Sequence, residues 1–216
     1  MDSIKTELLT LVDDPHKPIN NYNLGCAYFI EEQYAIAFSY FLRCAEFTST
    51  ITLATECLLF CSKCLSFQGG RDGKEYDLIN HALSIGSDYP EVHYIKSLYH
   101  SWRKEWTQCY ATCCMAFKIV KSFDKTCKND IFGYTGKSDL LYQHALSAYH
   151  RGKFNESKQI YFDILNTDEI SDDRRTIIMD KLGQFPVPFS APITNDYNHS
   201  QIFQDVFVER VMNNKR

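Results

Sequence analysis

The sequence has no apolar run close to the roughly 20 residues that a membrane-spanning helix requires. Its first residues, MDSIKTELLTLV, lack the basic start and the uninterrupted apolar stretch of a secretory signal peptide. Positive charge is not in excess, because 23 Lys and Arg stand against 27 Asp and Glu, for a net charge of −4. These absences argue against membrane insertion, and against a general nucleic-acid or membrane-surface binder, which would need a basic face.

Motifs for catalysis are also missing. The glycine-rich stretch Gly69–Gly73 has neither the Lys-Ser/Thr pair nor the preceding strand of a phosphate-binding loop, so we interpret it as a turn. The acid pairs Glu31-Glu32 and Asp172-Asp173 fall at expected helix ends, where solvated carboxylates are common, which argues against acid–base catalysis. No Ser-His-Asp or Cys-His arrangement can be chosen, because the sequence does not fix which residues meet. We therefore predict no enzymatic activity, no catalytic residue and no cofactor.

What the chain does contain is a pattern of small and large residues between Pro18 and Cys44, which reads PINNYNLGCAYFIEEQYAIAFSYFLRC. The small residues Gly25 and Ala37 would let two helices approach closely, while large residues fill the space between them. This order of Leu-Gly, Tyr, Ala and Phe resembles the tetratricopeptide repeat (TPR), a helical hairpin of about 34 residues. The large residues of the pattern are Leu24, Tyr28 and Phe41.

The same spacing of small and large residues recurs three more times along the chain, although the residue identities vary. Matched first positions fall near residues 18, 54, 90 and 138, and the last step is the longest because residues 121–137 form an irregular connection. A short helix from Asp2 to Val12 and another from Asp172 to Leu182 flank the units. The resemblance implies an all-α fold: a TPR-like superhelix of about four helical hairpins with terminal capping helices and a partly irregular C-terminal tail.

Four segments are expected along the chain. Residues 1–17 form an N-terminal capping helix, residues 18–183 the TPR-like repeat domain, and residues 184–199 a proline-containing linker. Residues 200–216 form a short helix that resembles the start of an FkbM-type methyltransferase domain, through Ser-Gln and a following Gln-Asp. Similar arrays stand beside glycosyltransferase or FkbM-type domains. The alternative function is therefore the N-terminal helical module of a larger glycosyltransferase or methyltransferase involved in glycan modification.

The nine cysteines are an odd number, and without a leader we expect reduced thiols in the cytoplasm. Cys57, Cys61 and Cys64 have the spacing of the iron–sulfur motif of radical S-adenosylmethionine enzymes. The same spacing places three residues on one face of a helix, and the flanking residues are apolar, so we favour helix packing.

A second set of possible metal ligands lies in the third unit. A structural zinc site would need two close ligand pairs at short spacing, and this set lacks them. Its histidines occupy repeat positions that cysteines hold one unit earlier, so we predict no metal site. The set comprises His93, His100, Cys109, Cys113 and Cys114.

The resemblance also implies a concave surface lined by the first helix of each hairpin. Aromatic side chains recur there, which suits capture of an extended peptide or a partner helix; alternatively, these rings pack against neighbouring units. The TPR variety that clamps a C-terminal carboxylate uses Lys and Asn at such positions, whereas this chain has Tyr. We predict a non-catalytic scaffold for protein–protein interaction, with a protein or peptide segment as partner. The predicted groove residues are Tyr22, Phe29, Tyr94, Trp102, Tyr142 and Tyr149.

Overall fold

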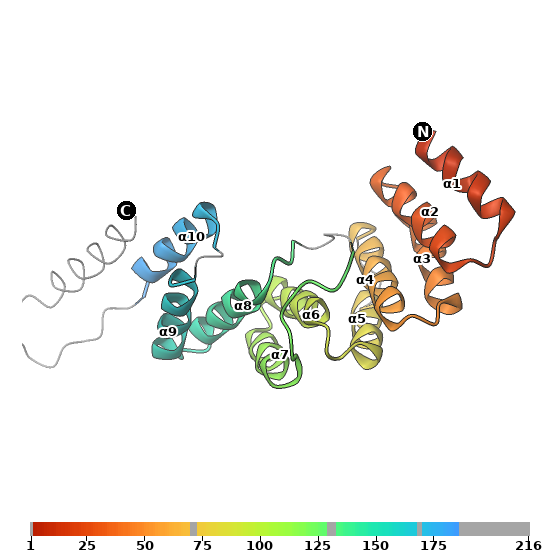
Figure 1. Cartoon of the computed structure of the whole chain (residues 1–216). Helices are drawn as coiled ribbons and strands as arrows, with labels where there is room; N and C mark the ends of the chain where they lie inside the picture. The colour runs from red at the N-terminus through yellow and green to blue at the C-terminus, as the bar shows by residue number, and fades with distance from the viewer. Residues whose placement is uncertain (1, 70–72, 129–132, 168–169, 186–216) are drawn as a thin grey trace, which may run out of the picture. The chain divides into compact units, whose positions relative to one another are not determined.

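The computed structural model describes residues 2–69, 73–128, 133–167 and 170–185. Within these ranges the chain forms ten α-helices and no strand, which confirms the all-α prediction (Figure 1). The chain separates into two units, Met1–Leu182 and Gly183–Arg216. Most of the predicted linker and the whole FkbM-like helix at 200–216 lie outside the described residues.

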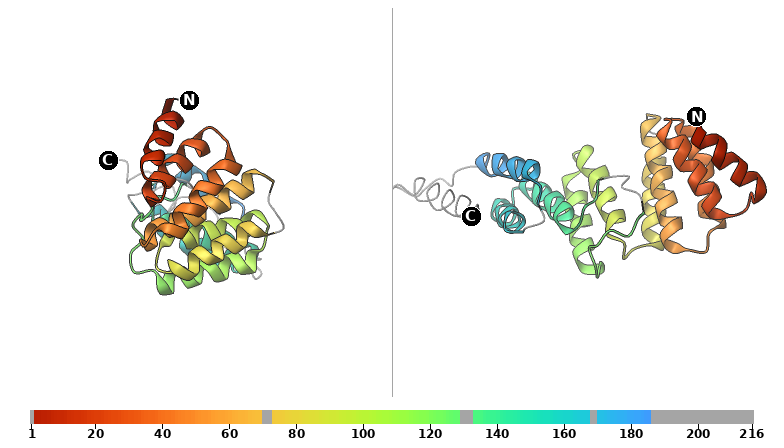
Figure 2. Two further views of the ribbon diagram at one scale, coloured as in Figure 1. Left: turned by 90° about the vertical axis from the view of Figure 1, so that its right-hand side faces the viewer. Right: turned by 45° about the horizontal axis from the view of Figure 1, so that its top comes forward.

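Helices α2 to α9 form four hairpins that follow one another in chain order, as Figure 2 shows. Helix α1 covers one side of the first hairpin and α10 follows the last. The bounds are α1 Asp2–Asp13, α2 Pro18–Ile30, α3 Tyr34–Phe47, α4 Ile51–Phe67, α5 Lys74–Ile85, α6 Pro90–Trp102, α7 Trp106–Ile119, α8 Lys137–His150, α9 Phe154–Leu165 and α10 Asp172–Gly183.

Three of the four hairpins are closed by the same tight turn. Glu32, Lys104 and Gly152 each adopt a left-handed backbone conformation, with φ of 59°, 59° and 75°. In each turn the next residue donates its N–H to the carbonyl five positions earlier, at 2.8–2.9 Å. This pattern satisfies carbonyls that a helix end leaves unpaired. The second hairpin has a longer turn instead, and Gly73 enters α5 at φ 80°.

The first hairpin packs as its sequence predicts. A Cβ atom on Gly25 would lie 2.8 Å from the ring of Phe41, so only glycine fits there without a shift. Phe41 is fully buried and stacks on Phe60 of α4, with ring centroids 4.3 Å apart. Because Gly25 has no side chain, the Phe41 ring lies directly against α2. The same ring also contacts Phe60, which belongs to the next hairpin.

Candidate functional site

The six aromatic residues predicted to line a groove occupy different environments. Two are almost fully buried, Tyr22 at 4% and Tyr94 at 7% exposure, and Trp102 is 69% exposed. The other three, Phe29, Tyr142 and Tyr149, are half-buried.

The two buried tyrosines belong to the interior of the array. Tyr22 donates its hydroxyl to the buried carboxylate of Glu56, and its ring meets Phe41 edge-on at 6.0 Å. Tyr94 packs against Tyr134, with centroids 5.4 Å apart. Tyr134 comes from the irregular connection, so a repeat alignment could not reveal this contact. In this conformation both rings stabilise the array, and a direct part in partner binding stays a prediction.

In the fourth hairpin, the predicted rings contact the helices that follow. Tyr142 lies 5.9 Å from Tyr161 of α9, and the guanidinium of Arg174 of α10 lies 5.7 Å from its ring centre. Tyr149 meets Phe154 at 5.4 Å. Their groove role likewise stays a prediction.

A cleft of about 110 Å³ opens between α4 and α6. Two aromatic side chains on its rims are open to solvent, Phe67 at 53% and Trp102 at 69% exposure. The ammonium of Lys63 lies 5.6 Å from the centre of the Phe67 ring and 5.8 Å from that of Phe29. The cleft therefore brings Trp102 close to Phe67, which itself contacts Phe29 at 6.0 Å. Its apolar lining comprises Phe67, Ile79, Ile95, Leu98, Tyr99 and Trp102.

The N-terminal halves of the same two helices are covered by the connection between α7 and α8. Glu91 of α6 accepts the backbone N–H of Thr126, the Thr126 hydroxyl at 2.7 Å and the N–H of Cys127 at 2.9 Å. Glu56 of α4 accepts the N–H of Lys128 at 3.1 Å. Both carboxylates are buried, at 1% exposure for Glu56 and 3% for Glu91.

On both α4 and α6, the region beneath the connection and the region that lines the cleft lie on the same face of the helix. Glu56, Lys63 and Phe67 are spaced i, i+7 and i+11, which places them in line along α4. Glu91, Leu98 and Trp102 have the same spacing on α6. Each line therefore begins at a buried acid beneath the connection and ends at an exposed ring about 16 Å further along the helix.

A second polar cluster joins α7, α8 and α9. The Tyr110 hydroxyl donates to Glu156 at 2.7 Å, and Lys153 donates to Tyr110 at 2.6 Å and to Glu156 at 3.0 Å. His144 Nε2 lies 3.3 Å from Glu156 and 3.7 Å from the Cys114 thiol. Burial lowers the pKa of His144, and the nearby Glu156 carboxylate partly opposes this.

This cluster does not have the geometry of a Cys-His-acid triad. In such a triad, one imidazole nitrogen faces the thiol while the other is held by the acid. Here Cys114 and Glu156 both face Nε2 of His144, so the carboxylate cannot orient the imidazole towards the thiol. We interpret the cluster as a hydrogen-bond network that fixes the packing of three helices.

The residues considered as metal ligands have partners within the fold. The thiols of Cys57, Cys61 and Cys64 lie in α4 and are fully buried in the core that α2, α3 and α4 share. His93 Nε2 lies 2.8 Å from the Ser87 carbonyl oxygen. Within the part of the chain that the structure describes, no group of three or more His, Cys, Asp or Glu side chains is arranged to hold a metal ion.

Burial should make the thiols of α4 unreactive. It raises the pKa of Cys64 to about 12 and that of Cys61 further, whereas the ordinary value is 9.0. At about pH 8 the reactive thiolate of Cys64 then falls from about one tenth to about one ten-thousandth of the population. We expect iodoacetamide to leave Cys57, Cys61 and Cys64 unmodified in the native chain and to label the half-buried Cys114 first.

Peptide mass spectrometry after timed quenching measures this order. Denatured protein is the control, because all nine cysteines should then react. Alkylation of Cys61 in the folded chain as fast as that of Cys114 would contradict the assignment of these thiols to the core.

Sequence reasoning missed Phe67, Tyr99 and the two buried acids, although a signal for some of them exists. Glu56 and Phe67 recur 35 residues later as Glu91 and Trp102. Counting the second unit from residue 54 placed Glu56 and Glu91 one position apart and so hid this recurrence. The structure begins α4 earlier, at Ile51.

No described helix is both long enough and apolar enough to cross a membrane. No protein-family model matches the sequence, and no curated protein matches it. Among solved structures, the crystal structure of MamA, a TPR-containing protein, is similar to this chain, with a TM-score of 0.56 at 14% sequence identity. The match covers 84% of this chain and 90% of that chain. The helical array of this chain therefore has a TPR-like fold, as the Leu24-Gly25 pattern predicted.

Proposed function

We propose that this chain is a helical-repeat scaffold that binds a protein segment at the cleft between α4 and α6. The observation that carries the proposal is the exposure of two large rings, Phe67 and Trp102, on the rims of one apolar cleft. Covering such rings removes apolar area from water, and aromatic residues of this kind dominate the binding energy of protein interfaces.

The size and charge of the cleft favour one kind of occupant. At about 110 Å³ it is smaller than the 300–1,000 Å³ typical of cofactor or drug-sized sites, and it suits a single anchoring side chain. Lys63 and Arg103 lie over the rims, at Phe67 and Tyr99, and Glu105 pairs with Arg103 at 3.0 Å. The partner is therefore a peptide segment with one large apolar side chain.

The test is to replace both rings, Phe67→Ala with Trp102→Ala. Affinity purification with mass spectrometry on the unaltered chain identifies partners, and titration of each partner then gives its Kd. We expect the Kd to rise by about 30-fold or more, since two truncated hot-spot residues account for at least about 2 kcal/mol. The melting temperature should change little, because both rings face solvent.

Phe47→Ala is the matched control, since Phe47 is 46% exposed on α3 and does not line the cleft. Its Kd should equal that of the unaltered chain. Unchanged partner binding by the double variant would show that the docking site is elsewhere.

The wider proposal includes no catalytic role, no nucleic-acid partner and a cytoplasmic location. The net charge of −4 supports the second point, and nine free cysteines suit a reducing compartment. The six predicted aromatic residues remain candidates for contact, and Phe29 and Trp102 are the two nearest to the cleft.

A second candidate function rests on the FkbM-like stretch at 200–216, which lies outside the described residues. The array would then position an acceptor for a glycosyltransferase or methyltransferase. A glycine-rich strand–turn–helix encoded after Arg216 would support this function, and a stop codon there would favour the scaffold.

A further inference from the structure

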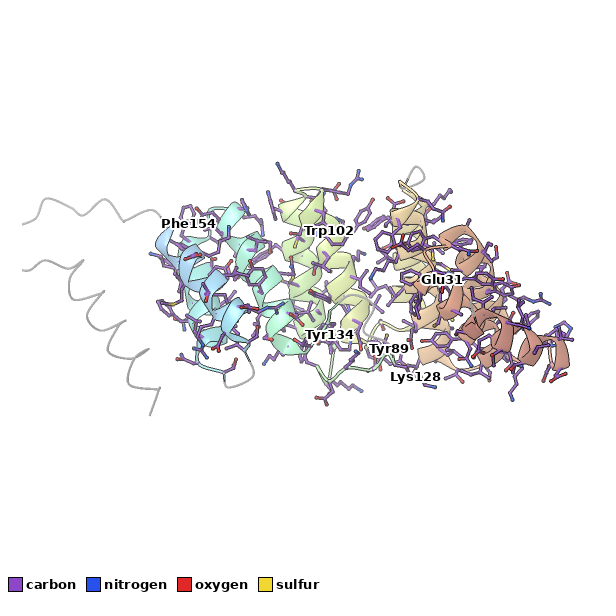
Figure 3. The ribbon with its side chains drawn as sticks, turned by 90° about the horizontal axis from the view of Figure 1, so that it is seen from above. Glu31, Tyr89, Trp102, Lys128, Tyr134 and Phe154 are labelled. Carbon is purple, nitrogen blue, oxygen red and sulfur yellow. The ribbon has the colours of Figure 1, made fainter. Side chains whose placement is uncertain are left out.

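The connection between α7 and α8 takes a long path for a link between two adjacent helices. From Val120 it runs back past α6 until Lys128 reaches α4, and residues 133–136 then lead into α8 (Figure 1). In Figure 3, Lys128 and Tyr134 lie near Tyr89, at the start of α6, and Trp102 lies toward the opposite edge. The other junctions between hairpins, residues 48–50 and 86–89, are single short turns. Joining α7 to α8 does not by itself require this detour.

The part that reaches α4 is held mainly through its backbone. Consecutive N–H groups of Thr126, Cys127 and Lys128 donate to carboxylates of two different helices. Bound peptides can also be held through main-chain hydrogen bonds, while their side chains give specificity.

The acceptors form a built site. Glu56 and Glu91 are buried, and a buried carboxylate is strongly destabilising unless hydrogen bonds satisfy it. Tyr22 supplies one donor to Glu56, and the connection supplies the donors to Glu91. Three consecutive N–H groups of the connection thus satisfy part of the hydrogen bonding of the two buried acids across α4 and α6.

The side chains of residues 126–128 indicate which residue type a ligand would need at each position. The Thr126 hydroxyl donates to Glu91, and Cys127 is buried against Val92 and its neighbours in the core between α4 and α6. The next side chain, Lys128, is exposed, as are Asp124 and Lys125 before the segment. Cys127 is the one buried apolar side chain of residues 124–128, whereas Phe123 packs against Phe117 in a separate cluster, with ring centroids 5.4 Å apart. One small apolar side chain is a weak anchor for the stretch that lies on Glu56 and Glu91.

We propose that Thr126–Lys128 is an internal ligand that occupies a peptide-binding site at Glu56 and Glu91. The external ligand is a segment of a partner protein that can bend as residues 126–128 do, with a hydroxyl residue, then a small apolar residue, then a further free N–H. This inference rests on the scaffold function, but it concerns the N-terminal halves of α4 and α6, whereas the aromatic cleft lies at their C-terminal halves.

The experiment uses a labelled, N-acetylated peptide SFDKTCKND, which reproduces residues 122–130, and the full chain. Thr126→Pro in the protein removes the N–H and the hydroxyl that Glu91 accepts and so weakens the internal ligand. We expect the peptide to bind this variant at least about tenfold more tightly than the unaltered chain, because a site that is mostly occupied shows a reduced apparent affinity. A peptide with Val at the position of Thr126, or Glu91→Gln added to the variant, should reverse the gain.

Equal affinity for the two proteins, or binding to neither, overturns the proposal. A second measurement decides the matter even if Thr126→Pro does not fold. In the unaltered chain, excess peptide should speed hydrogen exchange at the amides of Thr126 and Cys127 and leave Tyr161 in α9 unaffected. Unchanged exchange at both amides also overturns it.

The proposed function can fail separately. The Phe67→Ala, Trp102→Ala protein should still exchange its connection for the peptide, because neither ring contributes a hydrogen bond to that site. Loss of partner binding in that variant therefore reports on the cleft alone.

Discussion

Replacing Phe41 by Ala is expected to lower the free energy of unfolding by about 3–5 kcal/mol. The Phe41 ring is fully buried, stacks on Phe60 at 4.3 Å and meets Tyr22 at 6.0 Å. It also lies over Gly25, which has no side chain to move into the space. The substitution would leave a cavity where α2, α3 and α4 meet, and the loss is large because their backbones cannot close it.

The matched control lies on the same helix. Phe47 is 46% exposed, so Phe47→Ala should change the free energy of unfolding by less than about 1 kcal/mol. Urea unfolding followed by circular dichroism measures both variants, and hydrogen exchange in α2 to α4 reports on this part of the array, since repeat proteins can unfold in sections. Similar losses for the two variants would refute the placement of Phe41 at the centre of the packing.

The second large effect is expected at Asp139, at the start of α8. This carboxylate is fully buried and accepts the N–H and the hydroxyl of Thr135, the latter at 2.9 Å. It also pairs with the guanidinium of Arg174 from α10. Removing one partner of a buried pair destabilises by about 3–5 kcal/mol, and the 29% exposure of Arg174 reduces this, so Asp139→Ala should lose about 2–3 kcal/mol.

Three further variants show which contact of Asp139 is responsible for this loss of stability. Asp163→Ala on α9 is the control, because that exposed carboxylate accepts one hydrogen bond from Gln159, and we expect a change below about 0.5 kcal/mol. Arg174→Met completes a double-mutant cycle with Asp139→Ala, and the coupling energy measures the pair directly. A coupling near zero would mean that Asp139 acts only through Thr135.

The helical hairpins could be predicted because their determinants are local. The Leu24-Gly25 pattern and the turn at Glu32 depend on residues within one unit, and α2 begins at Pro18, the predicted first position of that unit. Spacing along a helix also placed the cysteines of α4 on a buried face. Such features follow from side-chain volume and helix periodicity alone.

The candidate site could be predicted only in part, since its features depend on which units meet. Trp102 was identified among the recurring aromatic residues, one position out of register. Tyr94, by contrast, is covered by Tyr134, which belongs to no repeat position. Glu56 and Glu91 look like ordinary surface acids in the sequence, and only the path of the connection shows that they are buried. Periodicity carries no information about a segment that returns to an earlier hairpin.

The hydrogen bond from Lys128 to Glu56 spans 72 positions in the chain. Arrays of helical hairpins otherwise form from neighbouring contacts, so each unit can fold as it leaves the ribosome. Here Glu56 and Glu91 lack these backbone donors until residues 126–128 have been synthesised. Completion of the second and third hairpins therefore has to wait for a later stretch of the polypeptide, and closing this long loop costs more chain entropy than contacts between neighbouring hairpins do.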